Sequence, residues 1–92
     1  MDVSIRKSKT RSRYELVADG RVIAILDYRV TGNRVVLPHT EVLRNLRGRG
    51  AAARLVRAAL DDLRAEGKRV VPTCWYVREF IRDNEDYADL VA

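Results

Sequence analysis

A short glycine-containing stretch, Arg47–Gly50, has the composition of an anion-binding loop. It reads Arg-Gly-Arg-Gly and lies between a predicted strand and a predicted helix that begins near Ala51. The first turn of a helix has backbone N–H groups without intrahelical partners and carries a partial positive charge. Glycines at positions 48 and 50 leave those groups uncovered, and Ala51 and Ala52 keep the following turn slim. A pyrophosphate group would suit this site.

The sequence around the loop is strongly basic. Five arginines and no acidic residue occur between positions 43 and 57, namely Arg44, Arg47, Arg49, Arg54 and Arg57. The loop is not a Walker loop, because the Gly-Lys-Ser/Thr ending is missing. It is not a dinucleotide fingerprint either, because Ala53 stands where the third glycine would be. The alternative interpretation is a tight strand–helix connection that binds nothing.

Three other side chains could transfer a proton or act as a nucleophile. His39 and Glu41 are two residues apart in a predicted strand, so they share one face. A histidine with a pKa near 6.5 can accept a proton around neutral pH, and a glutamate can act through a water molecule. Cys74 stands at the end of a predicted strand and before a predicted helix, a setting that lowers a thiol pKa. A surface histidine and a buried structural cysteine are the alternatives.

The elements that position these residues follow from the apolar pattern. The segments Tyr14–Ala18 and Arg21–Val30 form a predicted hairpin around the turn pair Asp19-Gly20, and a third predicted strand covers Arg34–Val42. These strands predict an antiparallel meander of three strands. Residues 1–12 form either a flexible basic arm or a short additional strand. Pro38 cannot donate to a sheet ladder, which indicates an edge or a bulge at that point.

A helix and a further strand complete the predicted fold. Apolar residues recur at helical spacing and Gly67 stands at the expected C-terminal cap; the apolar positions are Ala52, Leu55, Val56, Ala59, Leu60 and Leu63. The segment Arg69–Cys74 is predicted to lie parallel to the His39–Val42 strand through a right-handed crossover. A second helix is predicted over Trp75–Arg82. The fold class is α+β, with a mixed sheet flanked by helices.

Three motifs in order resemble the very small, single-domain members of the GNAT acyltransferase superfamily. They are H-T-E-V at 39–42, R-G-x-G-x-A at 47–52 and P-x-C-x-Y at 72–76, and the resemblance extends from about Tyr14 to the last residue. It implies a truncated acyl-CoA N-acyltransferase fold that takes acetyl-CoA as acyl donor and needs no metal. The family splays two neighbouring strands, so backbone groups near Glu41, Val42 and Leu43 would hold the pantetheine arm. The coenzyme would also contact Cys74 and the loop residues Arg47, Gly48, Arg49, Gly50, Ala51 and Ala52.

The resemblance further implies an N-acetyltransferase that acts on an unidentified primary amine. His39 and Glu41 would accept the proton of the amine, and Tyr76 would protonate the departing thiolate. Cys74 would either accept the acetyl group transiently or only line the site. Larger relatives have a tyrosine that acts as the general acid further along this helix, where the present chain has Phe80 or Ile81. Their C-terminal strands, which shape an acceptor site, have no counterpart in this sequence.

Length and composition limit the remaining choices. With 92 residues, we expect one domain over 1–92 and a monomer. One cysteine cannot form an internal disulfide, and neither a membrane-length apolar run nor a signal-peptide pattern is present, so we expect a cytoplasmic protein. The net charge of +5 suits a coenzyme phosphate or a nucleic acid. The alternatives to an enzyme are therefore a non-catalytic coenzyme-A-binding interaction domain or a nucleic-acid-binding module. The second is less expected, because the sequence lacks an RNP-type motif, zinc ligands and a helix-turn-helix.

Overall fold

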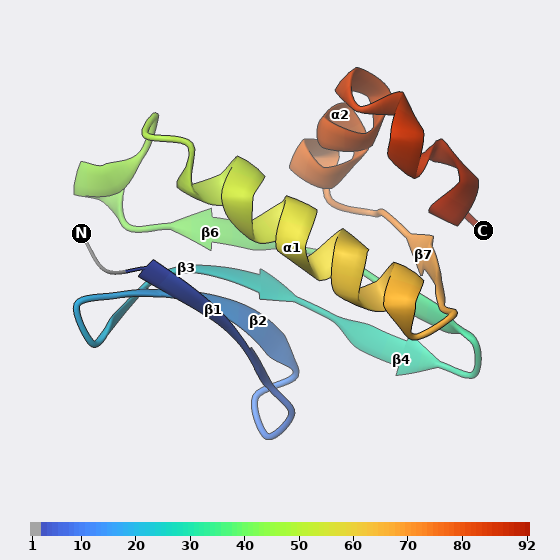
Figure 1. The fold of residues 1–92 in the computed structure, drawn as a ribbon, viewed down its shortest axis with the longest axis horizontal. Coiled ribbons are helices and arrows are strands. Elements are labelled where there is room, and N and C mark those ends of the chain that lie inside the picture. The colour runs from blue at the N-terminus through green and yellow to red at the C-terminus, as the bar shows by residue number, and fades with distance from the viewer. Residues whose placement is uncertain (1–2) are drawn as a thin grey trace.

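The strands form two small sheets that share one continuous chain path (Figure 1). The computed structural model describes residues 3–92. The first sheet is antiparallel and has the order β1-β2-β3-β6, with β1 at Val3–Ser8, β2 at Arg13–Ala18, β3 at Arg21–Asp27 and β6 at Thr40–Val42. The second sheet has the order β4-β5-β7, with β4 at Arg29–Thr31, β5 at Arg34–Val36 and β7 at Arg69–Val71. Strands β5 and β7 are parallel, so this second sheet is mixed.

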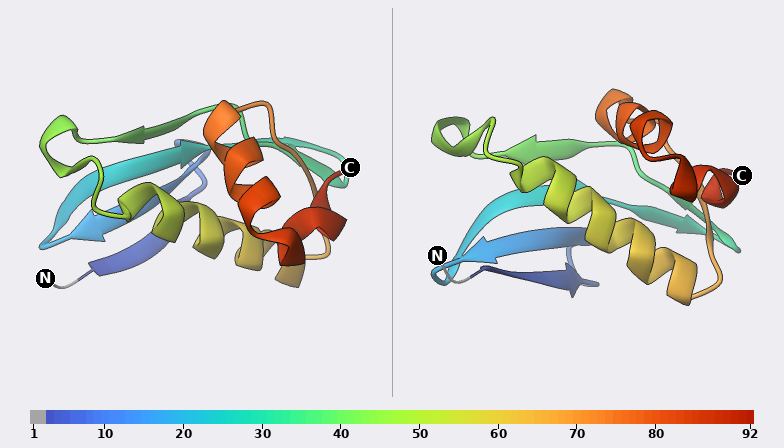
Figure 2. Two further views of the ribbon diagram at one scale, coloured as in Figure 1. Left: turned by 90° about the horizontal axis from the view of Figure 1, so that it is seen from above. Right: turned by 45° about the horizontal axis from the view of Figure 1, so that its top comes forward.

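The helices lie on one side of these strands, and the first sheet curves around the longest helix (Figure 2). The α-helices are α1 at Ala51–Ala65 and α2 at Trp75–Asp83, and two 3₁₀ helices are η1 at Arg44–Leu46 and η2 at Glu85–Leu90. The predicted apolar stripe of α1 is confirmed except at half-buried Ala52; its buried members are Leu55, Val56, Ala59, Leu60 and Leu63. Gly67 follows the helix with a φ of 71°. None of the helices within residues 3–92 has the length and apolarity needed to cross a membrane.

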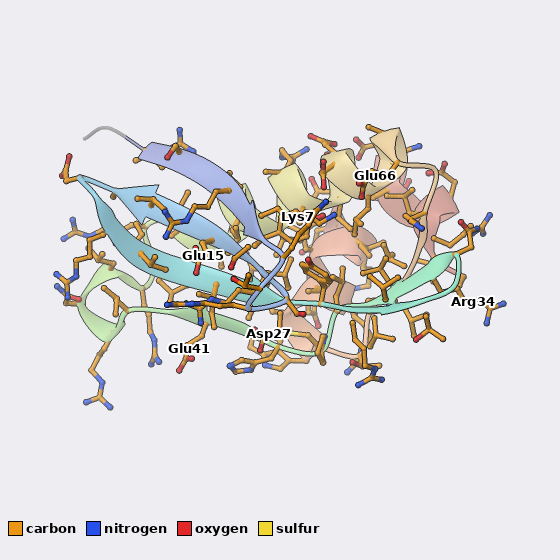
Figure 3. The ribbon with its side chains drawn as sticks, turned by 90° about the horizontal axis from the view of Figure 1, so that it is seen from below. Lys7, Glu15, Asp27, Arg34, Glu41 and Glu66 are labelled. Carbon is orange, nitrogen blue, oxygen red and sulfur yellow. The ribbon has the colours of Figure 1, made fainter. Side chains whose placement is uncertain are left out.

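Two tyrosines fasten α1 to its neighbours. The hydroxyl of Tyr14 on β2 donates to Asp62 of α1 at 2.6 Å, and the hydroxyl of Tyr87 on η2 donates to Asp61 at 2.6 Å. Lys7 on β1 donates to Glu66 at the end of the helix at 3.0 Å (Figure 3). Burial and the hydrogen bond to Asp62 raise the pKa of Tyr14, so this hydroxyl stays protonated at neutral pH. These bonds fix α1 in rotation and along its axis.

Two segments that the sequence predicts as single long strands are each divided in the structure. The first breaks at Tyr28, between β3 and β4, and the second breaks between β5 and β6. At the second break the N–H of Leu37 donates to Val71 and the carbonyl of Leu37 accepts from Cys74, both at 3.0 Å. Pro38, the next residue, has no N–H, and it marks the point where the chain leaves this ladder. The chain then joins the other sheet, where the carbonyl of His39 accepts from Asp27 at 2.9 Å.

The predicted parallel partner of the strand at 69–74 is therefore wrong. We expected this strand to pair with His39–Val42, but β7 pairs with β5 and includes only residues 69–71. Because the chain changes sheet at Pro38, β6 and the segment 72–74 separate after Leu37 instead of pairing. The N-terminal residues 3–8 form β1 and pair with β2, whereas the first two residues of the arm considered above lie outside the described residues.

One carboxylate is buried on the sheet face opposite α1. The side chain of Glu15 is only 2% exposed and accepts hydrogen bonds from Nε of Arg6 at 2.6 Å and Nε of Arg13 at 2.8 Å. The alternation of β2 places Tyr14 and Leu16 toward the helix and Glu15 away from it. The two arginine hydrogen bonds lower the pKa of Glu15 below its ordinary value of 4.5.

We predict that Glu15→Gln lowers the free energy of unfolding by about 2 kcal/mol at neutral pH, because both arginines lose their charged partner. Folding lowers the pKa of Glu15, so its contribution is present above the unfolded pKa and disappears as the pH falls through the folded one. Urea unfolding at about pH 7 and about pH 3 should show a difference between variant and parent that shrinks in acid. Glu85→Gln, an exposed glutamate of η2, is the control. An equal loss at both pH values would contradict this account.

Candidate functional site

The separation of β6 from the segment 72–74 opens a cleft of about 750 Å³. Its walls are β6 on one side and the start of α2 on the other, and the N-terminal end of α1 closes its base. Most of the residues predicted as site residues line it, namely His39, Glu41, Val42, Arg47, Gly48, Ala52, Cys74 and Tyr76. Arg49, Gly50 and Ala51 instead line a separate hollow of about 150 Å³. The structure thus brings the three sequence motifs to one place.

Strand β6 presents the backbone of alternate residues to the cleft. The carbonyl of His39 and the N–H of Leu43 bond to β3, at 2.9 Å each. Because the bonding direction alternates along an antiparallel strand, Glu41 also directs its backbone toward β3. The cleft therefore receives the backbone groups of Thr40 and Val42. Of the predicted backbone positions Glu41, Val42 and Leu43, only Val42 directs its backbone groups toward the cleft, and Thr40, which was not among them, does so as well.

The side chain of Arg47 already forms a hydrogen bond with one of these backbone groups. Its Nε donates to the carbonyl of Val42 at 3.3 Å, across the mouth of the cleft. The N–H of Arg47 is also engaged, since it donates to the carbonyl of Arg44 at 3.4 Å. A ligand arm that paired with Val42 would have to displace the guanidinium, which would then be free to turn toward a phosphate.

The N-terminus of α1 is open. Its cap residue is Gly50, with a φ of 77°, and no side chain within the described part of the chain caps the helix. Gly48 has a φ of 81°, and a Cβ added to either glycine would meet nothing within 4 Å. These glycines are therefore needed for left-handed backbone, which L side chains rarely adopt, and not because neighbouring atoms crowd them. The loop and the first turn leave donors exposed at the edge of the cleft.

Cys74 lies at the apex of the cleft and at the N-terminal cap of α2. It is 7% exposed, and its Sγ is 3.5 Å from the hydroxyl oxygen of Thr40. Burial alone would raise the thiol pKa. Hydrogen bonds from the Thr40 hydroxyl and from the backbone amides of Val77, Tyr76 and Thr40 outweigh burial and lower the pKa of Cys74 below its ordinary value. This thiol is thus easier to ionise than an ordinary one.

His39 and Glu41 stand together at the outer mouth of the cleft. Nε2 of His39 is 3.6 Å from Oε2 of Glu41, and their side chains are 55% and 61% exposed. Both belong to the face of β6 that points away from α1, while Thr40 and Val42 point inward. Both groups can therefore exchange protons with water as well as with a ligand in the cleft.

The first residues of α2 form the opposite wall. Tyr76 is half-buried and lines the cleft, and burial raises its pKa, so its hydroxyl carries a proton at neutral pH. Trp75 is 68% exposed, and the two rings meet edge to face with centroids 5.8 Å apart. Arg78, which sequence reasoning did not select, donates to the carbonyl of Thr73 at 2.9 Å and supports this turn. Within residues 3–92 no group of three or more His, Cys, Asp or Glu side chains is arranged to hold a metal ion.

Two solved structures share this architecture. The solution structure of a GCN5-like protein from Staphylococcus aureus matches with a TM-score of 0.74 and 20% identity, over 97% of this chain and 87% of that one. The crystal structure of the ribosomal-protein-S18-alanine N-acetyltransferase from Escherichia coli matches with a TM-score of 0.69 and 13% identity, over 84% and 53% respectively. The fold is that of the acyl-CoA N-acyltransferases.

Sequence comparison then gives the family. Residues 13–90 match the family described as GCN5-related N-acetyl-transferase, so this chain belongs to the GNAT family, and the family resemblance inferred from its motifs is confirmed. Relatives include Protein NATD1 of Bos taurus, 47% identical over 62 residues that cover 66% of this chain and 55% of that protein. Protein NATD1 of Danio rerio is 34% identical over 90 residues, which cover 91% and 82%. The match to the bovine protein thus spans little more than half of that relative.

We predict that Cys74 reacts with iodoacetamide with a pH midpoint below the ordinary thiol value of 9.0, because folding lowers its pKa. Thr40→Val removes the hydroxyl that bonds the sulfur and should move the midpoint upward, whereas Thr40→Ser should preserve it. Alkylation rates against pH, followed by mass spectrometry, measure this, and the chain unfolded in urea supplies the reference. A Thr40→Val midpoint equal to that of the parent would show that this contact does not tune the thiol.

Proposed function

We propose that this chain is an acetyl-CoA-dependent N-acetyltransferase acting on a primary amine. The observation that carries the proposal is the cleft between β6 and residues 72–74. This cleft runs from Gly48 and Ala52, beside the uncapped N-terminus of α1, to the thiol of Cys74. A cleft of this extent suits an acyl-CoA, whose phosphates would lie at the loop and whose thioester would lie near Cys74.

The residues fit acetyl-CoA in three places. Exposed amides at the start of α1, with Arg47 and Arg49 beside them, suit the pyrophosphate. The inward backbone groups of Thr40 and Val42 can pair with the amides of the pantetheine arm as a neighbouring strand would. The thioester then reaches Cys74 at the apex. A cleft of about 750 Å³ lies within the usual range for ligand sites.

Direct transfer needs little from the side chains. Glu41 or His39 removes the proton from the ammonium form of the acceptor, directly or through water. The amine nitrogen then bonds to the thioester carbon as the carbon–sulfur bond breaks. Tyr76 supplies a proton to the departing thiolate, and the second proton, which the nitrogen loses as the amide forms, returns to the Tyr76 oxygen through water. Holding both reactants in line lowers the barrier further, by several kcal/mol.

A covalent route uses Cys74 as a carrier. Its thiolate attacks the thioester carbon, the bond to the coenzyme sulfur breaks, and an acetyl-cysteine remains on the enzyme. The amine then attacks that carbon, the Cys74 thiolate leaves, and the amine proton passes to Glu41 or His39. The lowered pKa of Cys74 favours this route, because it increases the thiolate fraction at neutral pH.

A second candidate function is a non-catalytic coenzyme-A-binding domain. The observation in its favour is the exposure of His39 and Glu41, whose side chains are not enclosed by the site. We further propose a cytoplasmic location, because a reducing environment keeps the single Cys74 thiol free, and a monomer.

The ligand proposal predicts a specific effect of Gly48→Ala. Acetyl-CoA at one hundred times its dissociation constant should stabilise the parent by about 2.7 kcal/mol, a rise in Tm of roughly 10 °C or more. An added Cβ at a φ of 81° distorts the loop and should remove most of that rise. Gly32→Ala, in the β4–β5 turn at a φ of 61° and equally free of neighbours, is the matched control and should keep it. Thermal-shift titrations that gave both variants the same ligand response would contradict the anion site.

The catalytic roles predict different outcomes for two variants. Glu41→Gln should lower kcat/KM about 100-fold, the usual contribution of a general base. If the covalent route operates, Cys74→Ser should abolish the acetyl-cysteine that intact-mass spectrometry detects in the parent after acetyl-CoA is added without acceptor. Bound acetyl-CoA with no transfer to any amine, in the parent and both variants alike, would instead favour the non-catalytic domain.

A further inference from the structure

The open face of the second sheet carries a pair of arginines that the cleft does not use. Arg34 on β5 and Arg69 on β7 are register partners in the parallel ladder, so their side chains leave the same face side by side. Both are exposed. Like charges in this position destabilise a sheet. We refer to them as the arginine pair.

Burial shows which face this is. Val35 and Val70, the next residues of the two strands, are 1% and 0% exposed and belong to the core beneath the helices. Strand alternation therefore directs the arginine pair away from the helices. Figure 3 shows Arg34 projecting from the side of the strands opposite α1, the side from which Glu41 also projects. The arginine pair and the outer mouth of the cleft thus share one face.

Neither arginine of the pair is held in a salt bridge. Among residues 3–92, no acidic group makes an ion pair with Arg34 or with Arg69. One amino group of Arg69 donates to the carbonyl of Val91 at 2.9 Å, which fixes the guanidinium, and its charge acts on Asp89 only at longer range. A third arginine, Arg29 of β4, leaves the same face, because its register partner is Val36.

The surface between the arginine pair and the cleft, which we call the strip, is apolar and is not covered by a helix. Val36 and Val71 are register partners on the outer face, and both are half-buried. From Arg69 to Cys74 the chain advances five residues, which in extended form is roughly 16 Å. At the cleft end of the strip Glu41 lies on this face with the apolar register partner Ile25, whereas Asp27, also on this face, is the register partner of Arg13. Glu41 and the arginine pair are therefore separated by a short apolar surface.

We propose that the acceptor is an extended peptide that presents its reactive amine to the cleft and a carboxylate to the arginine pair. This inference rests on the transferase function proposed above. In an extended peptide, side chains four residues apart lie on the same side and are about 13 Å apart. That spacing matches the strip once the reach of the arginine side chains is included. Charge complementarity directs the amine to Glu41 and the carboxylate to Arg34 and Arg69.

A set of single-lysine peptides with blocked ends tests the spacing. Each carries one pair of glutamates centred two, three, four or five residues from the lysine, on either side, in an otherwise neutral sequence. The peptide with the four-residue spacing should have a KM about tenfold lower than the neutral peptide, since two charged hydrogen bonds are gained at a partly screened site. Peptides with three- or five-residue spacing should gain less, because those side chains point away. Lysine-free peptides with a free N-terminus distinguish a terminal amine from a lysine as the acceptor.

Charge reversal tests the residues. The double variant Arg34→Glu with Arg69→Glu should lose the preference for glutamate and favour lysine at the same spacing, while its transfer to butylamine stays unchanged. Arg21→Ala, an exposed arginine at the far hairpin, should keep the parental preference. Preference for glutamate that survived the reversal would overturn the assignment.

Peptide binding can be measured separately from acetyl transfer, through the fluorescence of Trp75. This residue is the single tryptophan, lies beside the cleft and is 68% exposed. The binding assay distinguishes a failure of this inference from a failure of the proposed function. Spacing-dependent binding that the reversal abolishes would support the docking surface even if no amine were acetylated, which would contradict the transferase alone. Transfer to amines with no spacing dependence in either assay would contradict the docking surface alone. A short RNA that displaced the peptide more strongly than free glutamate-rich peptide would assign the arginine pair to nucleic acid and overturn the inference.

Discussion

The organisation of the site depends on the change of sheet that the chain makes at Pro38. Up to Leu37 the chain is paired with β7 and the residues that follow it, through Leu37 to Val71 and Cys74 to Leu37. The Leu37 carbonyl points toward Cys74, so the nitrogen of Pro38 points away from that segment and has no N–H, and the next carbonyl, that of His39, accepts from Asp27 of β3. The cleft exists because one strand is divided between two sheets, and the edge of β6 that faces the cleft has no partner strand within residues 3–92. An unpaired edge of this kind is a ready template for another extended chain.

Helix α1 is held firmly in place, while the backbone N–H groups of its first turn have no side-chain cap among the described residues. Its buried stripe and the tyrosine bonds to Asp61 and Asp62 anchor the middle and the C-terminal half. A side-chain cap would occupy the first-turn donors, and a glycine cap with left-handed backbone avoids this. Stability is thus concentrated where no ligand is expected, and the N-terminal end of the helix gives up part of it. The buried Glu15 carboxylate and its partners Arg6 and Arg13 serve the same purpose on the far face of the sheet, where no helix covers the strands.

The sequence was sufficient for the elements and their order but not for the way strands pair. Periodicity placed the α1 core at Leu55 to Leu63, and Asp19-Gly20 and Gly32-Asn33 placed the turns, because these signals are local. The pairing of β7 with β5 depends on where a single strand changes partner, and Pro38 marks that point without revealing which half pairs with which strand. For the same reason, the sequence did not show that the backbone groups of Thr40, and not those of Leu43, face the cleft. Side-chain alternation alone could have separated Thr40 from Glu41, but backbone direction required the register with β3.

Under the proposed function, a domain of this size brings two reactants together without a second lobe, because residues of both faces of the strands line the cleft. Thr40 and Val42 belong to the inner face with Gly48 and Ala52, whereas His39 and Glu41 belong to the outer one. A donor that approaches along α1 and an acceptor that approaches from the uncovered side would meet at Cys74 without competing for the same surface. The charges follow this division, since the loop at 47–49 is basic and the outer mouth carries Glu41. Alternation along a three-residue strand would then be enough to separate the two substrates and to orient them in line.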